Sequence, residues 1–226
     1  MPQNVFSQLF RDVLLPLLST PSAWVLIILA GGLLFIKKYS RYVKGIFGEK
    51  VLSAILRNRC GEACIVFDDI TLAVAAGDTT QVDHIVISPA GIFIIETKCY
   101  QGLIYGRAAD REWTQKIFRR SYRFQNPFRQ NYKHVKAVQA IFPDIQPGCI
   151  HSLVLMSGGC RWAGQTRPAL LFTSGRQLAG YISDRTGTTP RCIDVDAVSG
   201  RLREVRLKSG LKTRREPVRN LRHRHR

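Results

Sequence analysis

The stretch QVDHIVISPAGIFIIETKC, residues 81–99, decides how this chain folds. Its two outer runs, 81–88 and 92–99, are rich in Ile and Val, as β-strands are. Between them lies Pro89-Ala90-Gly91, which is a typical turn sequence. The stretch therefore predicts an antiparallel β-hairpin.

The register of this hairpin decides which polar side chains meet. A two-residue loop at Ala90-Gly91 would place Asp83 opposite Lys98. Glu96 would then lie on the neighbouring diagonal, on the same face, because side chains along a strand alternate with a period of two. The sequence thus predicts two carboxylates and one ammonium group close together on an otherwise apolar strand pair.

Charges beside an apolar sheet are costly unless they are paired or bind a metal. Mg²⁺ is typically held by one or two carboxylates, so Asp83 and Glu96 suit Mg²⁺ or Mn²⁺. Lys98 could orient or deprotonate a water molecule, or neutralise charge on a phosphate. The alternative is a structural ion pair between Asp83 and Lys98 with Glu96 in solvent, since acidic-x-Lys is a short pattern.

A third carboxylate lies upstream of the hairpin. Residues 45–58 show the apolar spacing of an amphipathic helix, whose stripe consists of Val51, Leu52, Ile55 and Leu56. Glu49 lies three residues before Leu52, and we expect it to project near that stripe and toward the sheet. The alternatives are an acid in the first turn of the helix, where the helix dipole favours it, or a plain solvated residue.

A second helix is predicted after the hairpin. Asn126-Pro127 reads as an N-cap followed by proline at the first helical position, and the helix should end near Phe142. Gln130 and His134 are four residues apart and share a face. From that face, Gln130 could reach a metal-bound water or a phosphate oxygen, and so could His134. Both residues are explained equally well as polar side chains that are hydrogen-bonded within the core.

The rest of the domain reads as further strands and helices. Two buried strands are expected at 149–158 and 168–175, a short helix at 176–183, and a final strand or the approach to a helix at 190–197. Strands with helices packed on them imply a layered α/β sheet. By size, residues 45–200 form one domain.

The N-terminal part carries a long uncharged segment. Residues 13–36 contain no charged side chain, and this segment is long enough to span a bilayer. We therefore predict a transmembrane helix at 13–36, after a short N-terminal segment 1–12. A basic linker follows at 37–44 and, by the positive-inside rule, places the rest of the chain in the cytoplasm. The alternative is a buried core helix.

The chain carries a formal net charge of +18. The tail 201–226 holds eleven Lys or Arg against two Glu and so contributes +9, and residues 37–200 contribute another +9. Such charge is typical of nucleic-acid or anionic-lipid binding. A basic cluster interleaved with aromatic residues is predicted to bind nucleic acid, and it consists of Lys116, Arg119, Arg120, Arg123 and Arg129. The alternative is a solvated, charged loop and helix start.

The six cysteines form no C-x-x-C pair and no cluster with the spacing of zinc ligands. In a cytoplasmic domain we expect all six to be reduced and most of them to pack as small apolar residues.

Several of these motifs together resemble the nuclease-related domain (NERD) family, in order and spacing, over about residues 45–140. The matching residues are Gly48-Glu49, Gln81-Val82-Asp83-His84, Pro89-Ala90-Gly91-Ile92, Ile95-Glu96-Thr97-Lys98, Tyr100, Gly102, Trp113, Asn126-Pro127, Gln130-Asn131 and His134. The resemblance implies a restriction-endonuclease-like α/β domain with a central mixed sheet, of the PD-(D/E)xK type. Asp83 follows Val82, where the wider superfamily has proline.

The resemblance also implies a metal-dependent nuclease site. Its members would be Glu49, Asp83, Glu96 and Lys98, with Gln130 as a helper. We expect Asp83, Glu96 and the Thr97 carbonyl to bind Mg²⁺ or Mn²⁺, and Glu49 to bind a second metal or its water shell.

The expected protein is therefore a membrane-anchored nuclease that acts on nucleic acid, with DNA favoured over RNA. Restriction-type nucleases often cut duplexes as dimers, and a homodimer is left open. Two alternatives remain: a non-catalytic membrane tether that binds nucleic acid or anionic lipid through the basic cluster and tail, and a scaffold whose tail lies along the inner leaflet.

Overall fold

The computed structural model describes residues 10, 12, 20–74 and 78–207, and only the backbone of residues 23, 34 and 36–47. The chain divides into two compact units, Met1–Ile46 and Phe47–Arg226. Helix α3 (Pro21–Arg59) is continuous through this boundary. The predicted linker 37–44 is therefore helical, because no proline interrupts the helix after Pro21.

The predicted transmembrane helix 13–36 lies partly outside the described residues, since residues 13–19 are not among them. Among the residues that the structure describes, no helix combines the length and the apolar character needed to cross a membrane.

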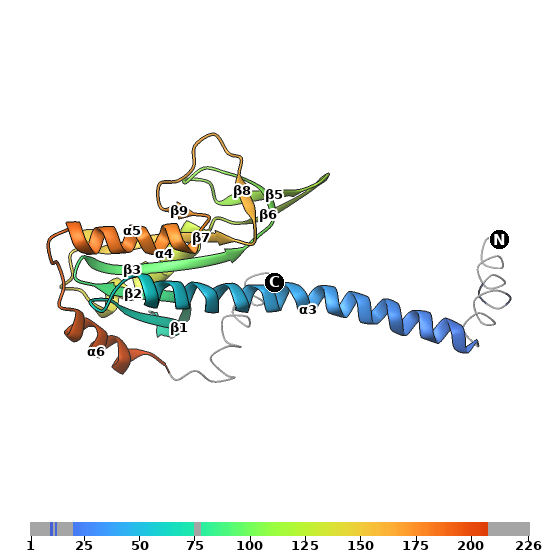
Figure 1. Ribbon diagram of the computed structural model, residues 1–226, viewed down its shortest axis with the longest axis horizontal. Helices are drawn as coiled ribbons and strands as arrows, with labels where there is room; N and C mark the ends of the chain where they lie inside the picture. Colours follow the sequence, from blue (N-terminus) through green and yellow to red (C-terminus); the bar gives the residue numbers. More distant parts are fainter. Residues whose placement is uncertain (1–9, 11, 13–19, 75–77, 208–226) are drawn as a thin grey trace. The chain divides into compact units, whose positions relative to one another are not determined.

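Within the described part of the second unit, the central sheet has five strands in the order β1-β2-β3-β7-β9 (Figure 1). The strands are β1 (Ile65–Ala73), β2 (Thr79–Ser88), β3 (Gly91–Cys99), β7 (Ile150–Ser157) and β9 (Leu171–Phe172). Strand β2 is antiparallel to its neighbours β1 and β3, whereas β3, β7 and β9 are parallel. The predicted central mixed sheet is confirmed.

The hairpin forms as predicted, but its register differs. Ser88 pairs with Gly91, so the two-residue loop is Pro89-Ala90 and not Ala90-Gly91. Gly91 has φ 133°, and a Cβ there would lie 2.3 Å from the carbonyl oxygen of Cys149. Glycine is therefore needed at the first position of β3, where a neighbouring segment approaches closely.

A second sheet follows the order β6-β5-β4-β8 within the described residues. Its strands are β4 (Gly102–Tyr105), β5 (Glu112–Ile117), β6 (Arg120–Gln125) and β8 (Cys160–Trp162). Strands β5 and β6 form a hairpin, called here the β5–β6 ribbon, whose turn end extends away from the rest of the second unit (Figure 1), while β5 also pairs with β4 along 114–116. The buried Trp113 of β5 donates its indole N–H to the Arg107 carbonyl at 2.9 Å, so it serves packing.

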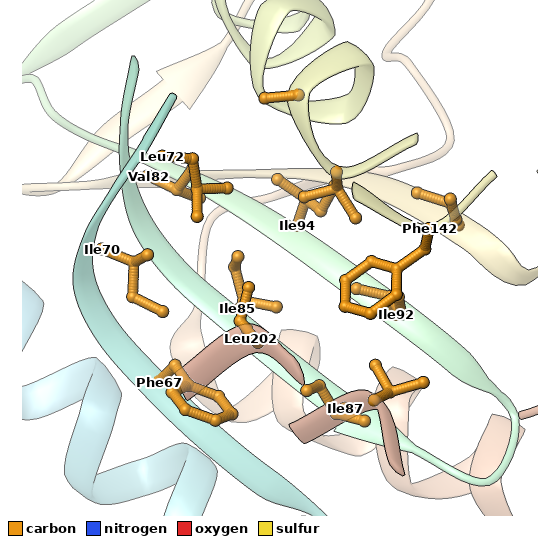
Figure 2. Packing of buried hydrophobic residues seen from close by; sticks show 14 of the residues in the cluster. Phe67, Ile70, Leu72, Val82, Ile85, Ile87, Ile92, Ile94, Phe142 and Leu202 are labelled. Atoms are coloured by element: carbon orange, nitrogen blue, oxygen red, sulfur yellow. The ribbon is translucent and has the colours of Figure 1, made fainter. Parts of the chain in front are cut away.

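Helices cover both faces of the central sheet. On one face, α4 (Pro127–Ile141) and α6 (Val195–Val205) pack on β1, β2 and β3 through a cluster that includes Leu202 and Val138 (Figure 2). On the other face, Leu52 and Leu56 from the last turns of α3 belong to a second apolar cluster, to which α5 (Gly175–Thr188) also contributes. The domain is thus a layered α/β fold, and α6 continues past residue 200.

Cys149 and Cys192 form a disulfide, with their Cα atoms 6.4 Å apart. The expectation of six reduced cysteines is therefore wrong for this pair. Cys149 ends the short helix η3 (Pro147–Cys149), and the backbone N–H of Cys192 donates to the Pro89 carbonyl at 2.8 Å. The two segments meet at the hairpin turn, which the spacing of the cysteines along the chain does not reveal.

Candidate active site

Glu96 of β3 is the centre of the candidate site. Its side chain is only 1% exposed. One carboxylate oxygen, Oε1, lies 2.6 Å from the Lys98 ammonium, and the other, Oε2, lies 3.1 Å from Nε2 of His134. Both oxygens of this buried acid are therefore paired, as a buried charge requires.

His134 of α4 connects Glu96 to a second strand. Its other ring nitrogen, Nδ1, lies 2.7 Å from the hydroxyl of Thr80 on β2. An ionised carboxylate can only accept hydrogen bonds, so Nε2 of His134 carries the hydrogen and donates it to Glu96. In the neutral imidazole, Nδ1 then accepts a hydrogen bond from the Thr80 hydroxyl. The four-residue spacing predicted that His134 shares a face of the helix with Gln130, but it gave no indication of the partner of His134.

Asp83 of β2 is held by Thr97 and not by Lys98. Its Oδ2 accepts two hydrogen bonds of 2.8 Å, from the backbone N–H and from the hydroxyl of Thr97. The ladder runs from Ser88–Gly91 to His84–Ile95, one position short of Asp83 and Glu96. The predicted Asp83–Lys98 pairing is wrong because the loop lies one residue earlier than expected.

A break in strand alternation accompanies this arrangement. Val82 and Ile85, three residues apart on β2, belong to the same core cluster, and so do Phe67 and Ile70 on β1. Between the latter pair, Asp69 has φ 52°. A strict period of two therefore does not hold across the strand segment that carries Asp83.

The electrostatics of the site follow from the proximity of its charges. Burial, and then the negative charge of Glu96, raise the pKa of Asp83, although the hydrogen bonds from Thr97 oppose this. Burial disfavours the charged form of Lys98, but the adjacent Glu96 and then Asp83 outweigh it and raise the pKa of Lys98. The lysine is thus held as an ammonium ion.

Glu49 lies on α3 with an exposed side chain. Partial burial of its carboxyl, followed by the negative charge of Asp83, raises its pKa. Glu49 is therefore within electrostatic reach of the site. The predicted apolar stripe of this helix is only partly correct, since Leu52 and Leu56 are buried but Val51 is 41% exposed.

Helix α4 begins as the sequence predicts, with the Asn126 side chain accepting from the Phe128 N–H at 2.9 Å. Gln130 is half-buried, and its side chain makes no hydrogen bond within the described residues. Its neighbour Asn131 is fully buried and anchors the helix to the sheet. The Asn131 side-chain nitrogen lies 2.9–3.1 Å from Ile94 O, Ser152 Oγ and Leu153 O, which share its two N–H groups.

A separate polar cluster surrounds Asp68 of β1. Its carboxylate accepts hydrogen bonds from Ser53 and Arg57 of α3 and contacts Nδ1 of His84 at 2.7 Å. These contacts overcome the effect of burial and lower the pKa of Asp68 to about 2. His84 thus belongs to the cluster around Asp68.

Asp83 and Glu96 suit a hard divalent cation. Mg²⁺ is commonly bound by one or two carboxylates with water completing its shell, and the like-charge repulsion that raises the pKa of Asp83 is what a cation would relieve. In the part of the chain that is described, however, no three or more His, Cys, Asp or Glu side chains gather closely enough to hold a metal. The residues therefore fit a site with two carboxylates.

The predicted nucleic-acid-binding cations are all exposed. Lys116 lies on β5, and Arg120 and Arg123 lie on β6. Arg119 lies in the turn between these strands, and Arg129 lies on α4. Arg123 and Arg129 also line an open groove of about 1080 Å³ together with Arg111 and Lys133, which the sequence reasoning did not single out. The groove lining also includes Asp110 and Glu112.

Residues 44–157 match the sequence profile of a family described as the nuclease-related domain. The chain is also 44% identical over 115 residues to an uncharacterized protein of Bacillus anthracis, and the match covers 51% of this chain and 54% of that protein. The chain thus spans about half the length of that relative. No solved structure matches the chain significantly.

Proposed function

Because the chain belongs to the nuclease-related domain family, we propose that it is a nuclease that hydrolyses phosphodiester bonds, with DNA preferred to RNA. The observation that carries the proposal is the buried Glu96, which is paired with Lys98 at 2.6 Å next to Asp83 on the adjoining strand. Two acids and a lysine in such proximity supply the groups that phosphodiester hydrolysis needs.

In this proposal Asp83, Glu96 and the Thr97 carbonyl hold Mg²⁺ or Mn²⁺, which when bound supplies Lewis acidity toward a phosphate oxygen and a water molecule. Glu49, within electrostatic reach of Asp83, contacts the water shell or a second ion.

The protein groups have separate tasks. Lys98, held as an ammonium ion, orients the attacking water and neutralises charge that develops on the phosphate. Thr97 fixes the orientation of Asp83, and His134 fixes that of Glu96. Gln130 has hydrogen-bonding capacity to spare on the inner half of α4, and it contacts a phosphate oxygen or a bound water.

The test compares the full-length wild-type chain with Asp83→Asn and Lys98→Met. We expect Asp83→Asn to weaken Mn²⁺ binding in calorimetry, and both variants to lose cleavage of labelled single- and double-stranded DNA. RNA substrates of the same sequence measure the preference for DNA.

Matched controls are Asp184→Asn and Lys136→Met, which remove exposed charges from α5 and α4. These controls should cleave like the wild type. Full cleavage by a pure, folded Asp83→Asn protein would overturn the proposal.

A second candidate function is nucleic-acid binding without cleavage, which the exposed cations of the β5–β6 ribbon favour. In that case binding would be weakened by salt, and neither Mg²⁺ nor Mn²⁺ would produce cleavage. The same titrations therefore distinguish the two functions.

We also propose that the N-terminal unit associates the protein with a membrane and leaves the second unit in the cytoplasm. Large apolar side chains of α3 are 47–69% exposed: Trp24, Val25, Leu26, Ile27, Ile28, Leu29, Leu33 and Phe35. Such a surface needs apolar cover. The chain should sediment with membranes and resist alkaline extraction, whereas a variant that lacks residues 1–36 should be released. Release of both proteins would contradict membrane association.

A further inference from the structure

The tip of the β5–β6 ribbon carries an aromatic side chain that folding does not explain. Ile117 pairs with Arg120, so Phe118 and Arg119 form a two-residue turn. Phe118 is 94% exposed and has φ 51°. Glycine, asparagine or aspartate usually occupies such a position, because a bulky side chain is strained at positive φ. Phe118 thus combines an unfavourable backbone conformation with a side chain that is almost fully exposed.

The sides of the ribbon are cationic. Lys116, Arg119, Arg120 and Arg123 are exposed, and the sequence from 113 to 125 contains no acid. Glu112 at the base contacts one of these cations, Arg123, at 3.6 Å. Exposed cations therefore lie on both strands of the ribbon and in the turn that carries the exposed ring.

The base of the ribbon is firmly packed. Phe124 contacts Tyr100 and Trp113, with ring centroids 4.5 and 6.3 Å apart, and Phe128 of α4 contacts Trp113 at 6.0 Å. Aromatic side chains near the base thus hold the ribbon on the domain, and the ring at its tip is presented on a fixed support.

Positive charge continues from the ribbon into the groove. Arg123 belongs to both the ribbon and the groove, whose lining also includes Arg129 and Lys133 of α4. The next residue of that helix, His134, contacts Glu96 at 3.1 Å. Helix α4 therefore supplies cations to the groove and a partner to the candidate catalytic acid.

We propose that the β5–β6 ribbon recognises unpaired bases in nucleic acid. Phe118 stacks on a base at the tip, while the flanking cations and the groove hold the phosphate backbone on either side. The substrate class is thus single-stranded nucleic acid or a duplex with a gap or bulge. This inference rests on the proposed function for the identity of the partner, and it adds which form of nucleic acid is bound.

The test uses the full-length protein in EDTA, so that binding is measured without metal-dependent cleavage. The probes are a single strand, a duplex with a one-nucleotide gap and a continuous duplex, each with 2-aminopurine at a defined position. We compare wild type with Phe118→Gly, Phe118→Trp and, as a matched control, Tyr132→Ala, which removes another exposed aromatic residue from α4.

We expect the wild type to change 2-aminopurine fluorescence on the single strand and the gapped duplex, but not on the continuous duplex. Phe118→Gly should bind about 5- to 150-fold more weakly, the equivalent of one base–aromatic stack of about 1–3 kcal/mol. Phe118→Trp and Tyr132→Ala should bind like the wild type. Because glycine tolerates positive φ, Phe118→Gly should unfold at the same temperature or a higher one, which separates lost stacking from lost folding.

Unchanged affinity and fluorescence response in Phe118→Gly would overturn the inference. So would equal binding of the continuous duplex, or binding of vesicles that contain anionic lipid together with no binding of any oligonucleotide. The test also separates this inference from the nuclease proposal. Phe118-dependent binding without cleavage in Mg²⁺ or Mn²⁺ would contradict only the nuclease function. Cleavage that is unchanged in the Phe118 variants would contradict only the role of the ribbon.

Discussion

At the residue scale, the candidate site depends on how one buried acid is held. Glu96 receives Lys98 from its own strand and His134 from α4, and Thr80 of β2 contacts the far side of the imidazole. Each contact comes from a different position in the fold. Because the carboxylate is buried, the loss of any partner leaves an unpaired charge or a misoriented acid.

Replacing His134 by alanine should lower kcat and Mn²⁺ affinity by about 10- to 100-fold, as expected when the partner of a metal-binding acid is lost. His134→Gln, which keeps a donor near Glu96, should recover part of both. Thr80→Val should have a smaller effect. Calorimetry and single-turnover cleavage measure these changes, and urea unfolding reports stability. Wild-type metal affinity in a folded His134→Ala protein would contradict this role.

Asp68 gives a prediction for stability against pH. Its pKa is about 2 in the folded protein, below the ordinary 3.8, because His84, Ser53 and Arg57 favour the carboxylate. A depressed pKa contributes stability that is present above about pH 4 and is lost as the pH falls toward 2. Asp68→Asn should therefore cost roughly 2 kcal/mol at pH 7.

The difference in unfolding free energy between wild type and Asp68→Asn should shrink between pH 4 and 2, as urea titrations at each pH would measure. A difference that stays constant over this range would show that the carboxylate charge is not the cause.

At the element scale, α4 is the structural support of both the site and the groove. One face carries His134 toward Glu96, and neighbouring positions present Arg129 and Lys133 to the groove. The helix can do both because it is fixed to β3 and β7 by the buried amide of Asn131.

Asn131→Ala should destabilise the domain by about 2–3 kcal/mol, because it leaves the buried acceptors Ile94 O and Leu153 O without the amide and opens a small cavity. Lys136→Ala, on the exposed side of the same helix, should change stability by less than about 0.5 kcal/mol. Chemical denaturation measures both. Equal stability of the two variants would mean that Asn131 does not anchor the helix.

At the scale of the whole molecule, the C-terminal boundary of the folded domain lies beyond residue 200. Helix α6 continues to Val205, Leu202 is buried in the core, and the Leu207 N–H donates to the Thr71 carbonyl at 3.0 Å. Residues 208–226 lie outside the described residues and contain eight Lys or Arg and one Glu, a net charge of +7.

Two truncations should therefore behave differently. Ending the chain at residue 207 should leave the unfolding free energy within about 0.5 kcal/mol, and should weaken nucleic-acid binding with a shallower dependence on salt. Ending it at residue 200 should destabilise the domain by more than about 2 kcal/mol, because the core loses Leu202. Denaturation and salt titrations measure these effects, and equal stability of the two truncated proteins would contradict the boundary.

The sequence by itself determined the local elements and the chemical character of the site. The Ile- and Val-rich runs specify β2 and β3, the Asn126-Pro127 cap specifies the start of α4, and the acids and lysine of the hairpin are placed on adjoining strands by its short loop. These features depend on interactions between residues close together in the chain, which propensity and periodicity capture.

Only the tertiary structure decided the contacts between distant segments. The approach of Cys149 to Gly91 sets the turn at Pro89-Ala90, the docking of α4 brings His134 to Glu96, and the loop before α6 pairs Cys192 with Cys149. Each contact joins residues about 40 to 60 positions apart. Such contacts form because whole helices and strands bury their apolar faces together, and no local pattern in the sequence specifies which polar side chains that packing brings into reach.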